Sequence, residues 1–146
     1  KRGPFASVEQ EAVLSVLRTG ELLENRIARL LREFGLTSSQ YNVLRILRGE
    51  GKPMPCLEVA NRMIQVAPAI TRVVEQLLKL GLIDKRQCQD DRRVFHIEIK
   101  PAAQTLLKKI DQPLLDLHGT QLANVSARDL KTLIKILESI RQQSED

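Results

Sequence analysis

The stretch "AITRVVEQLLKLGLIDKRQCQDDRRVFHIEIKP", from Ala69 to Pro101, contains the residues that decide the fold. Its first part predicts a helix from Ala69 to Gly81, because apolar residues recur every three or four positions until the glycine ends the pattern. The segments "LIDKRQC" and "RVFHIEI" then predict two strands joined by the turn "QDDR", and Pro101 ends the second strand. We therefore expect a helix followed by a β-hairpin.

The residues before this stretch predict a second, shorter helix from Cys56 to Ile64, separated from the first by the tight turn "QVAP". Two helices joined by such a turn form a helix-turn-helix, and a hairpin directly after it makes the unit winged. The two prolines of "KPMP", ahead of Cys56, predict a stiff connector.

Four further helices are predicted outside the winged unit, over about 7–34, 37–49, 101–118 and from Ser126 onward. Ser7, Ser126 and either Thr37 or Ser38 are suited to cap their N-termini. The predicted fold class is mainly α with a small β component (α+β), a winged helix-turn-helix flanked by helices at both ends of the chain.

The composition limits the classes of function. The chain has 146 residues and a net charge of +5, which favours an anionic partner, whereas 3% aromatic residues argue against stacking on single-stranded nucleic acid. Cys56 and Cys88 form no CxxC pattern, so a reducing, cytoplasmic location is the default expectation. We find no apolar run of about 18 residues and expect no membrane span.

The helix from Ala69 to Gly81 has a polar face that suits a DNA-recognition helix. Thr71, Arg72 and Gln76 face outward and offer the hydrogen-bond donors that base edges in the major groove require. Gln65 in the preceding turn is within reach of a base or a phosphate, and Pro68 lies in the first turn of the helix. The simpler alternative is a solvated helix face.

The hairpin adds a cationic tip. Residues 62–100 contain eight basic and five acidic residues, so this segment carries +3 of the chain's charge. Asp91 lies two residues before Arg93 and is close enough to orient its guanidinium toward a narrow, electronegative minor groove. Lys85, Arg86 and Arg92 are candidates for phosphate contacts. The alternative is a charged tip that only prevents the sheet edge from pairing.

The segments "LTSSQYNVLRIL", "LEVANRM" and "APAITRVVEQLLKLGLIDKRQCQDDRRV", with the Leu-rich terminal helices, resemble the multiple-antibiotic-resistance regulator (MarR) family of winged-helix repressors. The resemblance covers nearly the whole chain and includes the family's wing signature, here Asp91-Arg92-Arg93. It implies a homodimer on a pseudo-palindromic operator, with Arg93 in the minor groove and Asp91 as its orienting partner. Many members have Ser or Thr directly before the proline, where this chain has Ala67.

The same resemblance implies a single domain over 1–146, in which 36–100 bind DNA and 1–35 and 101–146 form the dimerisation helices. It also implies release from DNA by a small aromatic or phenolic ligand or by oxidation. Leu17, Tyr41 and Leu114 are candidates for lining the ligand cleft. A physical argument also favours a dimer, since the apolar faces of the terminal helices exceed what the winged unit can cover.

No pattern indicates an enzyme, a cofactor or a metal site. We find no Gly-rich phosphate loop, no nucleophile with a partnering base and no zinc-ligand spacing, so no residue is predicted to be catalytic. Whether Cys56 or Cys88 senses oxidants stays open. The alternative to a DNA-binding regulator is a winged helix used only as a protein–protein interaction module.

Overall fold

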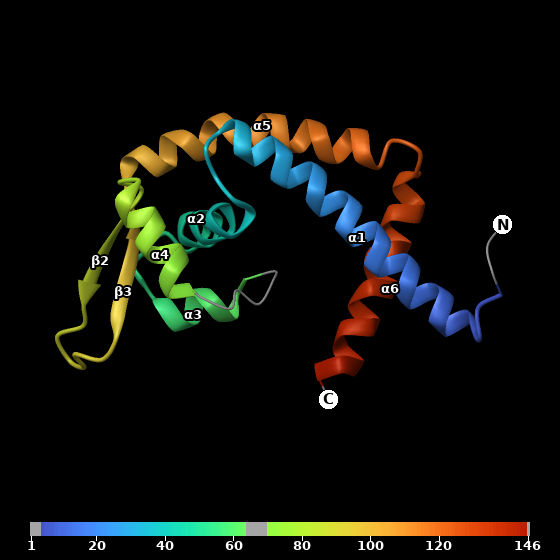
Figure 1. Ribbon diagram of the computed structural model, residues 1–146, viewed down its shortest axis with the longest axis horizontal. Helices are drawn as coiled ribbons and strands as arrows, with labels where there is room; N and C mark the ends of the chain where they lie inside the picture. Colours follow the sequence, from blue (N-terminus) through green and yellow to red (C-terminus); the bar gives the residue numbers. More distant parts are fainter. Residues whose placement is uncertain (1–3, 64–69, 146) are drawn as a thin grey trace. The chain divides into compact units, whose positions relative to one another are not determined.

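The computed structural model describes residues 4–63 and 70–145, and this part of the chain forms six helices and a small sheet (Figure 1). The helices are α1 (Val8–Glu33), α2 (Ser38–Glu50), α3 (Cys56–Asn61), α4 (Ile70–Lys79), α5 (Pro101–Gln121) and α6 (Ala127–Glu145). The strands are β1 (Met54–Pro55), β2 (Ile83–Gln87) and β3 (Phe95–Ile99). The mainly helical winged helix-turn-helix predicted from the sequence is confirmed.

Side chains cap three of the helices at the predicted residues. The hydroxyls of Ser7 and Ser126 accept hydrogen bonds from the backbone N–H three residues on, at 3.0 and 3.1 Å. At the start of α2, Thr37 Oγ1 accepts from the N–H of Gln40 at 3.1 Å, and Gln40 Oε1 accepts from the N–H of Thr37 at 3.0 Å. This reciprocal capping box settles the choice between Thr37 and Ser38 in favour of Thr37.

The sheet has three strands in the order β1-β3-β2, one more than the sequence predicted. The hairpin pairs β2 with β3 antiparallel, and β1 pairs with the other edge of β3, where Met54 lies opposite Ile97. The connector predicted for "KPMP" is therefore wrong at its last two residues. A two-residue strand has no periodicity to detect, and its proline is tolerated because β1 is an edge strand.

The short helix α3 also differs from its prediction, since it ends at Asn61 rather than at Ile64. The N–H groups of Arg62 and Met63 donate to the carbonyls of Val59 and Ala60, each three residues earlier, and this tightens the last turn. The predicted "QVAP" turn lies outside the described residues.

Gly81 makes the sharp connection from α4 to the wing. Its φ of 71° lies in the left-handed region, where residues with a Cβ are strained. This conformation lets the N–H of Leu82 reach back to the carbonyl of Leu77 at 3.1 Å, and the Leu82 side chain is buried beside it. Gly81 therefore turns the chain sharply from α4 into β2.

The chain divides into two compact units, residues 1–114 and 115–146. In the first unit α2 is the central element, because α1, α3, α4 and β3 all pack against it. Its buried side chains include Val43, Leu44 and Leu47, and Arg48 joins it to α5 through two 2.9 Å hydrogen bonds to Asp111. The helix-turn-helix and the wing are thus held by one apolar core.

The second unit consists of the end of α5 and of α6. Between residues 115 and 144, for which exposure is described, no side chain is buried. Large apolar side chains in this unit are exposed instead, namely those of Leu115, Val125, Leu133, Ile134, Ile136 and Ile140. Among the described residues, no helix combines the length and the apolar character that crossing a bilayer requires.

Candidate nucleic-acid interface

Helix α4 presents a polar face because its apolar residues are turned toward α2. Val73, Val74 and Leu77 are buried, whereas Thr71 and Arg72 in the first turns are exposed. Helical periodicity places these two sets on opposite sides of the helix. The exposed pair therefore occupies the N-terminal part of the helix, the part that meets base edges in helix-turn-helix proteins.

Gln76, the third residue predicted on this face, has a different environment. It is partly buried, and its Oε1 accepts a hydrogen bond from Nε2 of Gln40 at 3.0 Å. Its side chain is therefore attached to α2 as well as lying near the polar face. The two remaining predicted residues of this region, Gln65 and Pro68, lie outside the described residues.

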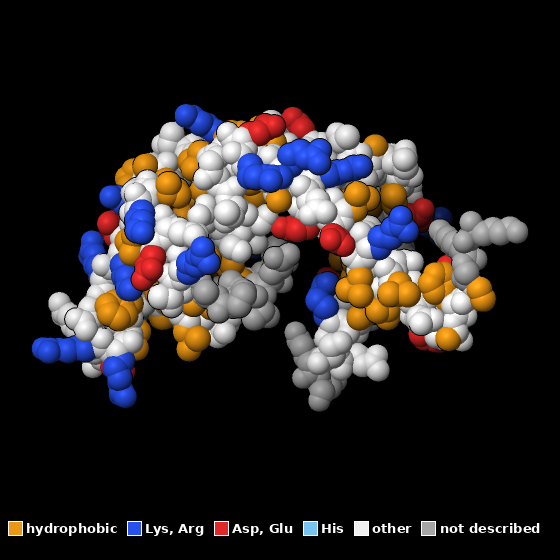
Figure 2. Space-filling model, viewed as in Figure 1, with side chains coloured by type: hydrophobic (Ala, Val, Ile, Leu, Met, Phe, Trp, Pro, Cys, Tyr) orange, Lys and Arg blue, Asp and Glu red, His pale blue; other side chains and the backbone are white. Residues whose placement is uncertain are grey.

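Backbone and side-chain hydrogen bonds order the tip of the wing. The N–H of Cys88 donates to the carbonyl of Val94 at 2.8 Å, and the N–H of Val94 donates to the carbonyl of Asp91 at 3.0 Å. Gln87 Nε2 donates to the carbonyl of Arg92 at 2.7 Å across the loop. The tip is thus held as a tight turn that projects its basic side chains (Figure 2).

Asp91 and Arg93 are in contact at this tip. Asp91 Oδ1 accepts from the backbone N–H of Arg93 at 3.0 Å and from its Nε at 3.4 Å. The Arg93 side chain remains 93% exposed. A carboxylate that contacts both the backbone and the Nε of one arginine restricts the direction of its guanidinium while the terminal nitrogens stay available.

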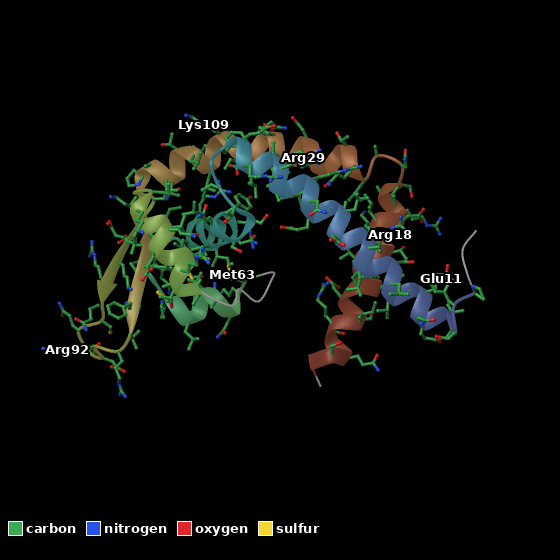
Figure 3. The ribbon with its side chains drawn as sticks, in the orientation of Figure 1. Glu11, Arg18, Arg29, Met63, Arg92 and Lys109 are labelled. Carbon is green, nitrogen blue, oxygen red and sulfur yellow. The ribbon has the colours of Figure 1, made fainter. Side chains whose placement is uncertain are left out.

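The other predicted cations spread along the hairpin. Lys85 Nζ lies 4.3 Å from the centre of the Phe95 ring, and Arg86 lies 3.9 Å from Glu98 on the neighbouring strand. Arg92 extends away from the tip of the hairpin (Figure 3). Because these side chains are exposed, a contact such as the Arg86–Glu98 ion pair is weak and leaves the cation available to an anionic partner.

A groove of about 450 Å³ joins the wing to the helix-turn-helix. Thr71 of α4 lines it together with Lys85 and Arg93 of the wing. The exposed apolar side chains of Leu57 and Phe95 also line it, and neither was predicted from the sequence as a site residue. Leu57 is one of four apolar residues in the six-residue helix α3, so the sequence offered no signal that its side chain is exposed.

Gln40 is a further polar residue of this region, and its role was not predicted from the sequence. Gln40 is buried, and it connects the capping box of α2 to Gln76 on α4. The motif "TSSQ" of residues 37–40 indicates the capping box, but nothing in the local pattern indicates the second hydrogen bond.

The cysteines are both free thiols and both partly buried. Burial raises the pKa of the Cys56 thiol above its ordinary value, and the positive charge of Lys85 only partly opposes this effect. A raised pKa reduces the thiolate fraction that reacts with oxidants. Within the described residues, no group of three or more His, Cys, Asp or Glu side chains is arranged to hold a metal ion.

The three residues predicted to line a ligand cleft lie in different environments. Tyr41 and Leu114 are each 8% exposed, whereas Leu17 on α1 is 64% exposed. Burial raises the pKa of Tyr41 above its ordinary value, so its hydroxyl stays protonated near neutral pH. None of these three residues lines the groove between the wing and the helix-turn-helix.

Comparisons with known proteins agree with this geometry. The sequence model of the MarR family matches residues 36–95, which include the helix-turn-helix and most of the wing. YwoH of Bacillus subtilis (strain 168), an uncharacterized HTH-type transcriptional regulator, is 26% identical over 93% of this chain and 98% of its own.

Solved structures extend the similarity over almost the whole chain. A MarR transcription factor from Planctomyces limnophilus is 33% identical, with a TM-score of 0.72 over 92% of this chain and 98% of its own. The organohalide-sensing regulator RdhR-CbdbA1625, in its 2,4-dichlorophenol-bound form, has the same fold, with a TM-score of 0.85 at 18% identity over 97% of this chain and 86% of its own. These relatives are transcriptional regulators rather than enzymes, and the chain belongs to the MarR family of DNA-binding transcriptional regulators.

Proposed function

We propose that the protein is a homodimeric repressor that binds a pseudo-palindromic operator in double-stranded DNA. The observation that carries this proposal is the groove between α4 and the wing, where Thr71, Lys85 and Arg93 meet. This arrangement allows α4 to contact bases in the major groove while the cationic tip of the wing contacts the adjacent DNA backbone. The choice of repression over activation rests on the family resemblance alone.

In this proposal α4 reads bases and the wing reads shape. Thr71 and Arg72 are exposed at the N-terminal part of α4 and contact base edges in the major groove. Gln65 and Pro68, which precede α4 in the sequence, are further candidates for DNA contacts. Arg93 enters the minor groove in the direction set by Asp91, while Lys85, Arg86 and Arg92 neutralise phosphates. By this division residues 36–100 form the DNA-binding portion.

The proposed dimer is supported by the apolar side chains that the single chain leaves exposed. Only Leu31 of α1 is buried, and Leu23, Ile27 and Leu30 are partly exposed. The other large apolar residues of this helix are exposed, namely Val8, Val13, Leu14, Val16, Leu17 and Leu22. The second unit likewise buries none of its residues between 115 and 144. Helices of this kind gain most of their stability from packing, so a second copy is the partner expected to cover 1–35 and 101–146.

Two-fold symmetry gives the operator its expected form. Two copies of α4 in a closed dimer meet the major groove about 34 Å apart, which is one helical turn of DNA. The two half-sites are then inverted repeats. Sedimentation of the wild-type chain and of Leu17→Glu tests the dimer: a wild-type dimer that the charged residue dissociates supports it, and a wild-type monomer contradicts it.

A salt series tests DNA binding itself. Affinity for a random-sequence duplex is measured at increasing salt concentration, and a protein that neutralises several phosphates loses affinity steeply because counterions are released. A linear decrease of log affinity with log salt supports the proposal. Absence of binding at every salt concentration favours the protein–protein interaction module.

Release by a small aromatic or phenolic ligand is the last element of the proposal. It is supported by the similar fold of a regulator solved with 2,4-dichlorophenol. Tyr41 and Leu114 are the buried candidates for the lining, and Leu17 would complete it from the exposed face of α1. Thermal unfolding with a panel of aromatic acids and chlorophenols tests this element, and a compound that stabilises the protein is expected to weaken its DNA binding.

A further inference from the structure

The side-chain amide of Gln40 lies in the core of a helix-turn-helix protein, where polar groups are uncommon. It is 7% exposed, although it belongs to the first turn of α2. A buried amide is costly unless its donors and acceptor find partners. Gln40 has two such partners, of which one is the N-cap residue of α2 and the other lies on α4.

The first partner determines the orientation of the amide. Gln40 Oε1 accepts from the backbone N–H of Thr37 at 3.0 Å, and a backbone N–H can only donate. The Nε2 atom is therefore the one that faces α4, and it donates to Gln76 Oε1 at 3.0 Å. The capping box thus fixes which atom of Gln40 is presented to the recognition helix.

This hydrogen bond restrains the rotation of α4 about its own axis. Val73, Val74 and Leu77 attach α4 to the core, but apolar burial is non-directional. A hydrogen bond is directional and weakens steeply as its angle changes. Gln76 lies four residues after Arg72 and on the same side of the helix, so a restraint on Gln76 also restrains the direction of Arg72.

The same bond limits what Gln76 can do at a base. A glutamine that reads adenine uses both its oxygen and its nitrogen, in a bidentate contact. One of the two lone pairs of the Gln76 oxygen already accepts from Gln40, and this bond restricts the direction of the amide. The geometry therefore favours an anchoring role for Gln76 over the base contact expected from the sequence.

We propose that Gln40 is a positioning residue for the recognition helix and that it acts through Gln76. Operator specificity would then depend on a buried side chain that does not touch DNA. The proposal rests on the proposed function, because it requires α4 to read the operator.

Methionine variants remove the hydrogen bond while preserving side-chain length and helix propensity. The variants are Gln40→Met, Gln76→Met and the double variant. Each is measured against a duplex that the wild-type protein selects from a random-sequence pool and against an unselected duplex. Each single variant is expected to lower the ratio of the two affinities about five- to 100-fold, the range of two lost hydrogen bonds, one in each subunit of the proposed dimer. The double variant is expected to lower it no further than the larger single effect.

A charge-neutral exchange separates anchoring from base contact. In the double variant Glu75→Gln with Gln76→Glu, the net charge of α4 is unchanged and the carboxylate at 76 still accepts from Gln40 Nε2. This carboxylate has no donor for a purine N7. Retention of the wild-type affinity ratio is expected if Gln76 is an anchor, and loss of that ratio overturns the proposal.

The remaining outcomes are also distinct. Thermal unfolding identifies folded variants, and Gln76→Met leaves the Thr37 cap intact if Gln40→Met fails to fold. An unchanged affinity ratio in folded Gln76→Met overturns the positioning role alone. A wild-type protein that selects no sequence from the pool rejects the proposed function and the positioning role together.

Discussion

Replacing Arg93 by alanine is expected to weaken operator binding without unfolding the protein. The side chain is 93% exposed, and its Nε lies 3.4 Å from Asp91. An exposed pair of this kind contributes about 0–1 kcal/mol to folding. The 3.0 Å bond from the backbone N–H to Asp91 survives in the variant, because alanine keeps that donor. The wing is therefore expected to keep its turn.

The expected loss of binding is larger than the loss of stability. A specific arginine contact contributes about 1–3 kcal/mol, and a dimer places two wings on one operator. If the two contacts are independent, the loss is about 2–6 kcal/mol, or roughly 30-fold to 10⁴-fold in affinity. If Arg93 also releases a counterion, the slope of log affinity against log salt decreases by about 0.9 per wing.

Fluorescence anisotropy with the selected duplex, over a range of salt concentrations, measures both quantities. Arg128→Ala is the matched control, since it removes the same charge from an exposed position on α6, outside the proposed DNA interface. Because α6 belongs to the proposed dimerisation portion, sedimentation checks that this control is still a dimer. A folded Arg93→Ala protein that binds the operator as tightly as the control contradicts the assignment of Arg93 to the minor groove.

Changes at Asp91 test whether orientation matters as well as charge. Asp91→Ala makes the wing more positive, so simple electrostatics predicts tighter binding. If Asp91 orients Arg93, Asp91→Ala instead binds the operator more weakly than the wild type does. Its affinity for random DNA is then not reduced. Asp91→Asn keeps the Oδ1 acceptor, so its operator affinity is expected to lie between those of the wild type and of Asp91→Ala. Tighter operator binding by Asp91→Ala refutes the orienting role.

Three further predictions concern stability and reactivity. Hydrogen bonding from Arg62 lowers the pKa of Glu50, so this pair stabilises the fold above the unfolded-state pKa of about 4.3 and loses its effect as the pH falls through the lower folded pKa. The difference in melting temperature between wild type and Arg62→Met should accordingly narrow below about pH 4. A difference that does not depend on pH would show that the Arg62–Glu50 ion pair does not stabilise the fold. Asp111→Asn weakens the bidentate contact with Arg48 and is expected to lower the free energy of unfolding, measured in urea, by about 1 kcal/mol. An unchanged urea midpoint would contradict this prediction. Because burial raises the pKa of Cys56, iodoacetamide at neutral pH should label this thiol more slowly than free cysteine, as measured by mass spectrometry. Rapid labelling would favour Cys56 as an oxidant sensor.

Much of the fold was predictable because its signals are local. Ser7, Thr37 and Ser126 cap the helices that follow them, and each capping hydrogen bond spans only three residues. The hairpin was likewise predictable, since strand-forming residues flank a polar turn. The contact of Asp91 with Arg93 spans two residues, so the tip of the wing was also within reach of sequence reasoning.

The missed features are contacts between residues far apart in the sequence. Met54 and Pro55 become a strand only because β3 lies beside them, and the two residues carry no strand pattern of their own. Gln40 meets Gln76 across 36 positions, and Arg48 meets Asp111 across 63. Polar residues of this kind look like ordinary surface positions until packing determines which of them face inward.

The amino-acid sequence by itself determined the order of the helices, the winged helix-turn-helix and the cationic tip. Each of these follows from capping, periodicity or turn chemistry within a few residues. Only the tertiary structure decided that Gln76 is tied to α2, and that Thr71, Lys85 and Arg93 line one groove. The physical reason is that backbone preferences act locally, whereas a groove or a buried hydrogen bond exists only after the apolar core has brought distant segments together.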